Sequence, residues 1–281
     1  MPELKVEIDV RSGFCGGVVR AINTAEKHLD SCGMLCSLGE IVHNEEELSR
    51  LGAKGLVPVA SLSDVPEGAK VLIRAHGVPP EIYAEAESRS LEVVDCTCPV
   101  VLRLQKSIRE APGKVLIFGK HGHPEVQGLV GQTSGAVVFQ DLAQLQDILP
   151  GLDRSLRYDL FSQTTMSPSA YLKACELLSQ VLPELVVHKT ICSQVASRHD
   201  ELESFAAGHD VVVFVSGSHS SNGRVLFDLC RSVNPRTYMA GDADAIDPAW
   251  FKDGDSVGIS GATSTPRWLL ERVAAALENL H

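Results

Sequence analysis

The chain of 281 residues lacks any run of about 18 or more apolar residues, the length that a helix needs in order to cross a bilayer. Its opening segment, MPELKVEIDV, lacks the basic head and apolar stretch of a secretion signal. We therefore expect no membrane anchor and a cytoplasmic protein. Apolar residues make up 44% of the chain, and glycine and proline are scattered, so the composition predicts a folded globular protein.

An excess of positive charge is also missing. The chain has 25 basic and 36 acidic residues, which gives a formal net charge of −11. This balance argues against nucleic acid or an anionic membrane surface as a partner. A phosphorylated ligand would have to be held by a local group of hydrogen-bond donors.

Several common motifs are absent. The sequence has no P-loop and no glycine-rich dinucleotide fingerprint after a strand. It also has no C-x-x-C pair, the usual source of ligands for structural zinc. The eight cysteines are expected to be thiols or metal ligands in a reducing compartment, and some of them to be only small buried apolar residues.

The most informative pattern that is present is a strand followed by a polar tip and a helix. Each apolar run ends in a glycine-, histidine- or hydroxyl-rich tip and is followed by helical periodicity. Six such units span residues 35–48, 70–86, 114–129, 157–178, 210–230 and 255–277. Six units predict an α/β protein with mostly parallel sheets, whose ligands bind at the carboxyl ends of the strands.

Three cysteines divide the six units at similar intervals. Cys15, Cys98 and Cys192 each stand directly before a helical pattern, and each is followed by two strands with polar tips. We therefore expect three pseudo-threefold-related lobes, a trefoil, around a central cavity. The predicted lobes are residues 12–95, 96–188 and 189–281, and residues 1–11 are expected to join the sheet of another lobe.

The tips at matching positions of the repeat carry polar side chains. Any one of these tips taken alone could equally be a solvated loop. The candidate residues are His43, His76, His123, Thr164, Ser220, Ser221, Asn222 and Ser264. Imidazoles, hydroxyls and amides can hold a phosphate or diphosphate where lysine and arginine are scarce. Their recurrence at matching tips favours a binding site over a set of unrelated loops.

A thiolate at a helix N-terminus is stabilised by the free amides there and becomes a better metal ligand. Cys98 is followed by Pro99, which is typical of a first helical position, and we prefer it to its neighbour Cys96. One cysteine from each lobe can bind zinc with a fourth ligand, or an iron–sulfur cluster. A four-iron cluster with three cysteines would leave one iron open to a substrate oxygen.

A carboxyl group and two hydroxyls belong to the second lobe's tips. Glu125 lies two residues after His123, and Thr164 and Thr165 lie at the partner tip. A diphosphate nearby would raise the pKa of this carboxyl group and suit it to deliver protons near neutral pH. A threonine could relay such a proton, although Thr165 is equally well explained as a helix cap.

Taken together and in order, the motifs GFCGGVVRAI, EIVHN, RAHGV, TCPVV, GHPEVQG, QTTMS, TIC, SSN and GATSTP resemble the LytB family of 4-hydroxy-3-methylbut-2-enyl diphosphate reductases. The resemblance covers nearly the whole chain. It implies a trefoil of three α/β lobes. It also implies an iron–sulfur enzyme that reductively dehydroxylates the allylic diphosphate to isopentenyl and dimethylallyl diphosphate, the last step of the non-mevalonate pathway.

The resemblance also implies roles for the candidate residues. The expected ligands of a [4Fe–4S] cluster with one open iron are Cys15, Cys98 and Cys192. The expected catalytic residues are Glu125, Thr164 and His123, and the expected substrate-binding residues are His43, His76, His123, Thr164, Ser220, Ser221, Asn222 and Ser264. Electrons would come from a ferredoxin or flavodoxin, and we expect a monomer.

Three departures from the family pattern lie in the third lobe. Val195 stands where a threonine is usual, Arg267 where a glutamate is common, and the loop before Ser220 is one residue shorter. The alternative functions are an iron–sulfur or diphosphate sensor without catalysis, and a zinc hydrolase. The presence of Glu125 and Thr164 argues against a sensor, and the absence of an H-x-x-x-H motif argues against the hydrolase.

Overall fold

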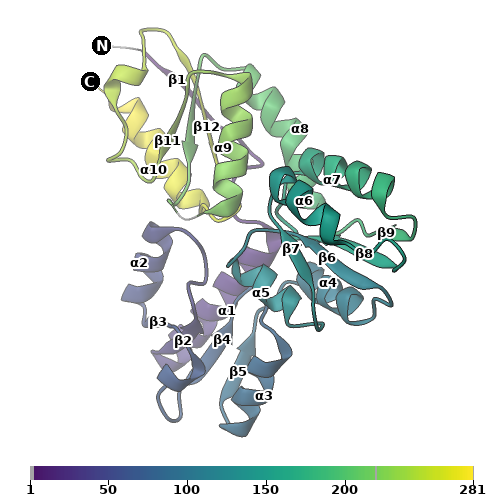
Figure 1. The fold of residues 1–281 in the computed structure, drawn as a ribbon. Coiled ribbons are helices and arrows are strands. Elements are labelled where there is room, and N and C mark those ends of the chain that lie inside the picture. The colour runs from purple at the N-terminus through teal and green to yellow at the C-terminus, as the bar shows by residue number, and fades with distance from the viewer. Residues whose placement is uncertain (1–2, 219, 281) are drawn as a thin grey trace. The chain divides into compact units, whose positions relative to one another are not determined.

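Three four-stranded sheets with intervening helices make up the fold (Figure 1). The structure, a computed structural model, describes residues 3–218 and 220–280, with residue 221 described by its backbone alone. All the strand pairs with a defined register are parallel. The α/β fold class with parallel sheets is thereby confirmed.

The first sheet has the strand order β3-β2-β4-β5. Its strands are β2 (Leu35–Leu38), β3 (Leu56–Val59), β4 (Lys70–Ile73) and β5 (Glu92–Asp95). The helices of this part of the chain are α1 (Gly16–Cys32), α2 (Glu45–Ala53) and α3 (Pro80–Ser88), with a short 3-10 turn, η1 (Leu62–Asp64).

The second sheet has the order β7-β6-β8-β9. Its strands are β6 (Lys114–Phe118), β7 (Val137–Phe139), β8 (Tyr158–Ser162) and β9 (Leu185–Val187). The accompanying helices are α4 (Pro99–Arg109), α5 (Pro124–Val130), α6 (Leu142–Ile148), η2 (Leu149–Gly151) and α7 (Pro168–Val181).

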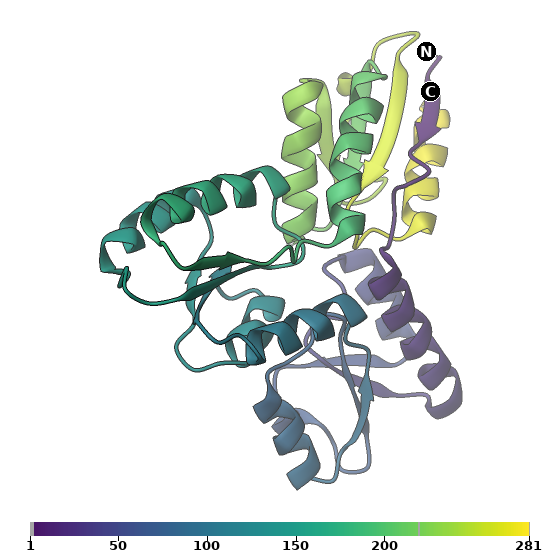
Figure 2. The ribbon, with the colours of Figure 1, turned by 90° about the vertical axis from the view of Figure 1, so that its right-hand side faces the viewer.

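The third sheet has the order β1-β12-β10-β11, so the N-terminal strand pairs with the last one. Its strands are β1 (Lys5–Ile8), β10 (Val211–Val215), β11 (Thr237–Ala240) and β12 (Ser256–Gly261). Its helices are α8 (Ser193–Ala207), α9 (Ser221–Val233), η3 (Pro248–Trp250) and α10 (Arg267–Glu278). In Figure 2, β1 lies beside the yellow C-terminal helix α10.

The three sheets repeat one strand order. The central strands of the three sheets are β2 and β4, β6 and β8, and β10 and β12. In each sheet, the first central strand is followed in sequence by an edge strand that pairs with it, which is β3, β7 or β11. In each sheet the fourth strand, β5, β9 or β1, leads into the segment with Cys98, Cys192 or Cys15. In the third sheet, β1 occupies the place that β5 and β9 take in the other two.

The chain divides into two compact units. One contains residues 1–34, 40–57 and 197–281, and the other residues 35–39 and 58–196. The first unit therefore unites the third sheet with α1 and α2, and the second contains the second sheet and most of the first. No helix in the described ranges combines the length and apolar character needed to cross a membrane.

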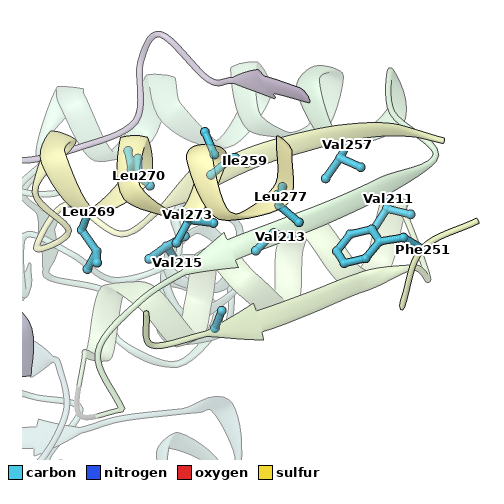
Figure 3. Close-up of a cluster of buried hydrophobic side chains, with 12 residues drawn as sticks. Val211, Val213, Val215, Phe251, Val257, Ile259, Leu269, Leu270, Val273 and Leu277 are labelled. Atoms are coloured by element: carbon cyan, nitrogen blue, oxygen red, sulfur yellow. The ribbon is translucent and has the colours of Figure 1, made fainter. Parts of the chain in front are cut away.

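The third sheet shows how alternation along a strand builds two cores. On one face, Val213 and Val215 of β10 pack with Ile259 against α10, where Leu270 and Val273 are also fully buried (Figure 3). On the other face, the intervening strand residues pack against α8 and α9. A valine-rich strand buried on both faces is typical of parallel sheets, because helices cover both sides.

We expect Ile259→Ala to lower the free energy of unfolding by about 2–5 kcal/mol, because it leaves a cavity between β12 and α10. Urea denaturation would measure the loss. Val10→Ala is the control, since Val10 is 84% exposed and its truncation should change stability by less than about 0.5 kcal/mol. Equal effects of the two variants would contradict this account of the core.

Candidate active site

The second sheet brings a carboxyl and a hydroxyl group together at the ends of its two central strands. Because β6 and β8 pair with Phe118 opposite Ser162, the segments that follow them emerge side by side. After β6 the chain turns through Gly122, with φ of 74°, and Pro124 starts α5. His123 caps this helix, and its Nδ1 accepts the Glu125 amide N–H at 3.1 Å.

Glu125 and Thr164 form a closely bonded pair. The amide N–H of Thr164 donates to Glu125 Oε1 at 2.7 Å, and its hydroxyl donates to Oε2 at 2.8 Å. Glu125 is only 2% exposed, and burial raises its pKa to about 7, although the two hydrogen bonds from Thr164 act in the opposite direction. Such a carboxyl group can both hold and release a proton near neutral pH.

Two histidines lie next to this pair. His76 follows β4, and its ring meets that of His123 edge to face, with 5.4 Å between centroids and an interplanar angle of 76°. Gly77, with φ of 70°, permits the turn immediately after His76. The tips of the first and second sheets thus meet through these imidazoles.

The cysteines of the same unit join this group through the backbone. The Cys98 amide donates to the carbonyl of Ala75, the residue before His76, at 3.0 Å. The Cys192 amide donates to the carbonyl of Thr164 at 2.9 Å. The structure therefore brings together His76, Cys98, His123, Glu125, Thr164 and Cys192.

The choice between the two cysteines at 96 and 98 has a structural basis. Cys96 is 1% exposed, whereas Cys98 is partly exposed and is the N-cap residue of α4. A thiol at a helix N-terminus has both access and a favourable field for the thiolate, so Cys98 is the better candidate ligand.

In the other unit, the third sheet presents a hydroxyl and amide cluster at the ends of β10 and β12. The hydroxyls of Ser220 and Ser264 lie 3.0 Å apart, and both side chains are buried. The amide and hydroxyl of Thr263 donate to Asn222 Oδ1 at 3.1 and 2.9 Å. Among the residues that the structure describes, no acceptor is found for the buried Asn222 Nδ2. A buried donor of this kind is stabilised by an anionic ligand.

Cys15 belongs to this cluster. It is the N-cap residue of α1, and its amide lies 3.3 Å from the carbonyl of Thr263. One tip residue therefore links Cys15 to Asn222. The side chain of Ser221, also a predicted ligand, lies outside the described part of the chain.

His43 lies against the loop that precedes Ser220. A Cβ atom on Gly217 would lie 2.5 Å from the His43 carbonyl oxygen, so only glycine allows this approach. Glu45 accepts hydrogen bonds from the amide and hydroxyl of Ser218, at 3.2 and 2.6 Å. His43 Nδ1 lies 3.2 Å from a carboxylate oxygen of Glu40. This unit thus gathers Cys15, His43, Ser220, Asn222 and Ser264.

The sequence departures in the third lobe have defined surroundings. Val195 is buried. The Arg267 side chain is directed to Glu271, at 3.2 Å, and to the carbonyl of Asp9, at 3.4 Å. Neither of these Arg267 contacts involves Ser220 or Ser264.

Two features escaped the sequence analysis. Thr263 holds Asn222, and the hydroxyl-rich GATSTP tip was the signal that could have indicated it. Arg198 is buried on α8 and bonds Asp9. The spacing of the sequence could have indicated this burial, because Arg198 lies on the same helical face as the apolar residues Val195 and Leu202.

The chain is similar to proteins of one family over nearly its whole length. The model of the family described as LytB protein matches residues 6–278. A 4-hydroxy-3-methylbut-2-enyl diphosphate reductase from Bacteroides fragilis is 44% identical over 288 residues and covers 98% of both chains. The protein of the same name from Chlorobium limicola is 39% identical over 317 residues, again with 98% of both chains covered.

Two solved structures are similar to the chain. A structure of (E)-4-hydroxy-3-methyl-but-2-enyl diphosphate reductase, described as the terminal enzyme of the non-mevalonate pathway, has a TM-score of 0.73 and 30% identity, and the match covers 98% of this chain and 99% of that one. The Plasmodium falciparum E-1-hydroxy-2-methyl-but-2-enyl-4-diphosphate reductase has a TM-score of 0.88 at 24% identity, over 99% of this chain and 88% of that one, which shows the fold.

Glu125→Gln should make the chain's stability less sensitive to pH. The raised pKa of about 7 means that folded Glu125 keeps its proton while the unfolded side chain ionises near 4.5. Wild-type stability should therefore fall by about 2–3 kcal/mol as the pH rises from about 5 through 7, and the variant should lack this loss. Urea denaturation at about pH 5 and pH 8, without substrate, would measure it.

The control for this experiment is Glu110→Gln, because Glu110 is exposed and makes only a weak pair with Lys106 at 3.8 Å. Its effect should be small and the same at both pH values. A Glu125→Gln variant with the same pH dependence as wild type would show that this carboxyl group titrates normally.

Proposed function

Because the chain belongs to the LytB family, we propose that it reductively dehydroxylates (E)-4-hydroxy-3-methylbut-2-enyl diphosphate to isopentenyl and dimethylallyl diphosphate. The observation that carries this proposal is the buried Glu125 carboxyl group, with a pKa of about 7, bonded to the Thr164 hydroxyl. Removal of a hydroxyl group as water requires a proton at that oxygen, and this pair can deliver one. A protein that only sensed a cluster or a diphosphate would need no such pair.

Family membership implies an iron–sulfur enzyme, and we propose a [4Fe–4S] cluster held by Cys15, Cys98 and Cys192. The three residues fit such a group, because each stands at the start of a helix and is partly exposed. By contrast, the thiols of Cys36, Cys96 and Cys230 are fully buried. When bound, a cluster with three cysteine ligands supplies electrons and one iron open to a substrate oxygen.

The diphosphate would be held by hydrogen-bond donors rather than by lysine or arginine. The proposed donors are His43, His76, His123, Ser220, Ser221, Asn222 and Ser264. Asn222 supports this role most directly, since its buried Nδ2 has no acceptor within the described ranges. An anionic oxygen would accept its hydrogen bond and remove the cost of burying it alone.

Proton delivery follows from the Glu125–Thr164 geometry. With Glu125 ionised, the threonine hydroxyl donates to the carboxylate. Once Glu125 is protonated, its own O–H can donate to Thr164 Oγ1, which releases the threonine proton for the substrate oxygen. The overall change adds two electrons and two protons to the alcohol and yields the alkene diphosphate and water.

The electrons would come from another protein. We propose a ferredoxin or flavodoxin as donor, because the sequence has no P-loop or dinucleotide fingerprint with which to bind a nucleotide reductant. The eight cysteines, none of which forms a disulfide, fit a reducing cytoplasm together with the proposed cluster. We further propose that the enzyme acts as a monomer.

Anaerobic purification tests the proposed cofactor and reaction together. We expect about four iron and four sulfide ions per chain, and consumption of the allylic alcohol diphosphate with a chemical or ferredoxin-supplied reductant. Changing Cys15, Cys98 or Cys192 to serine should lower the iron content and abolish turnover, whereas Cys32→Ser, at an exposed thiol, should change neither. The proposed reaction would be refuted if the protein contained zinc in place of iron. It would also be refuted if the visible spectrum of the cluster did not change when the allylic alcohol diphosphate was added.

Variants of the proton-delivering pair test the mechanism. Glu125→Gln and Thr164→Val should lower kcat by roughly 10²–10⁴, the usual contribution of general acid catalysis, while iron content stays constant. Thr164→Ser keeps the hydroxyl and should retain most activity. Wild-type kcat should decline as the pH rises above about 7, because the fraction of protonated Glu125 falls. A Thr164→Val enzyme with full activity would rule out the relay.

A further inference from the structure

Arg198 is a buried charge that the proposed reaction does not use. It lies on α8, is 5% exposed, and belongs to the same compact unit as Cys15. A guanidinium group taken out of water is unfavourable unless its donors are satisfied. Here the two terminal nitrogens, Nη1 and Nη2, are directed to a carboxylate, a hydroxyl and backbone carbonyls, whereas Nε has no acceptor among the described residues.

The partners of Arg198 come from two segments. On the N-terminal side, Nη1 donates to the carbonyl of Arg11, and Nη2 lies 3.2 Å from Asp9 Oδ2. At the end of β12, Nη2 also donates to Ser260 Oγ at 3.1 Å and to the Gly261 carbonyl at 3.0 Å.

The carboxylate of Asp9 completes this arrangement. It accepts the Arg11 amide at 2.9 Å through Oδ1 and the Ser260 hydroxyl at 2.9 Å through Oδ2. The bend between β1 and α1 is thus tied to the end of β12 at several points, and Arg198 bonds both sides.

Both tied segments lead to residues of the candidate site. Four residues after Arg11 comes Cys15, whose amide lies 3.3 Å from the Thr263 carbonyl. Two residues after Gly261 comes Thr263 itself, which holds Asn222. A movement of either segment therefore changes the place of the Cys15 thiol relative to the hydroxyl and amide cluster.

We propose that Arg198 is a positioning residue that fixes the Cys15 thiol for its metal. This inference rests on the proposed role of Cys15 as a cluster ligand. The planar guanidinium donates in fixed directions from two terminal nitrogens, from Nη1 to the Arg11 carbonyl and from Nη2 to the Asp9 carboxylate and the Gly261 carbonyl, whereas lysine carries all its donors on one nitrogen. Arg198 touches neither substrate nor cluster in this role.

The same lobe offers a matched control. Arg236 forms a bidentate pair with Asp255, with Nη1–Oδ1 and Nη2–Oδ2 distances of 3.0 and 2.6 Å. Asp255 directly precedes β12, so this pair lies at the opposite end of the strand from Gly261. Arg236→Lys should weaken the lobe without disturbing Cys15.

The test compares Arg198→Lys and Arg236→Lys in the full chain. Cysteine alkylation of the metal-free protein, resolved by peptide mass spectrometry, gives the rate at Cys15 relative to Cys98 in the same molecule. We expect Arg198→Lys to raise this ratio at least fivefold and to speed iron loss from the holoenzyme to a chelator. Arg236→Lys should leave both unchanged.

An unchanged Cys15 to Cys98 ratio in Arg198→Lys, or the same rise in Arg236→Lys, would overturn the inference and leave Arg198 as a structural ion pair. If Arg198→Lys does not fold, Asp9→Asn provides the test, with a smaller rise expected because the carbonyl contacts remain. A wild-type protein that binds no iron would refute the proposed function, yet the alkylation ratio would still report whether Arg198 positions the thiol.

Discussion

The parallel pairing of two central strands in each sheet is the constraint on which the candidate site depends. Because paired parallel strands end at the same edge, the residues that follow them must emerge together. In the second sheet this places Glu125 against Thr164, and in the third it places Ser220 against Ser264. The helices and cores serve to hold these edges in place, since they fix the strands and leave the tips free to carry chemistry.

Burial makes the Glu125 carboxyl group able to exchange a proton near neutral pH, and it also lowers the stability of the folded protein. The surroundings that raise its pKa to about 7 disfavour the ionised form, and the two bonds from Thr164 only partly compensate. Near neutral pH the folded protein is therefore less stable than it would be with a glutamine at position 125. It has instead an acid that is half protonated at this pH. Such local costs are common at functional sites.

Much of this could be predicted from the sequence. Each apolar run with a polar tip predicted a strand and the turn that follows its carboxyl end, and the cysteines indicated a repeat. What could not be predicted depends on distant parts of the chain. The sequence indicated that residues 1–11 join the sheet of another lobe, but it did not identify β12 as the partner strand of β1, nor Asp9 as the partner of the buried Arg198. These partners lie far apart in the chain, and local periodicity carries no information on them. The close approach of Gly217 to His43 is of the same kind.

The place of β1 also sets the order in which the molecule can be completed during synthesis. β1 is made long before β12, the strand with which it pairs. Domains otherwise tend to fold from the N-terminus onward as the chain grows. β1, which leads into the bend that carries Cys15, therefore has no partner strand until residues 256–261 have been made, so this bend can take its place beside the third sheet only after β12 has been added.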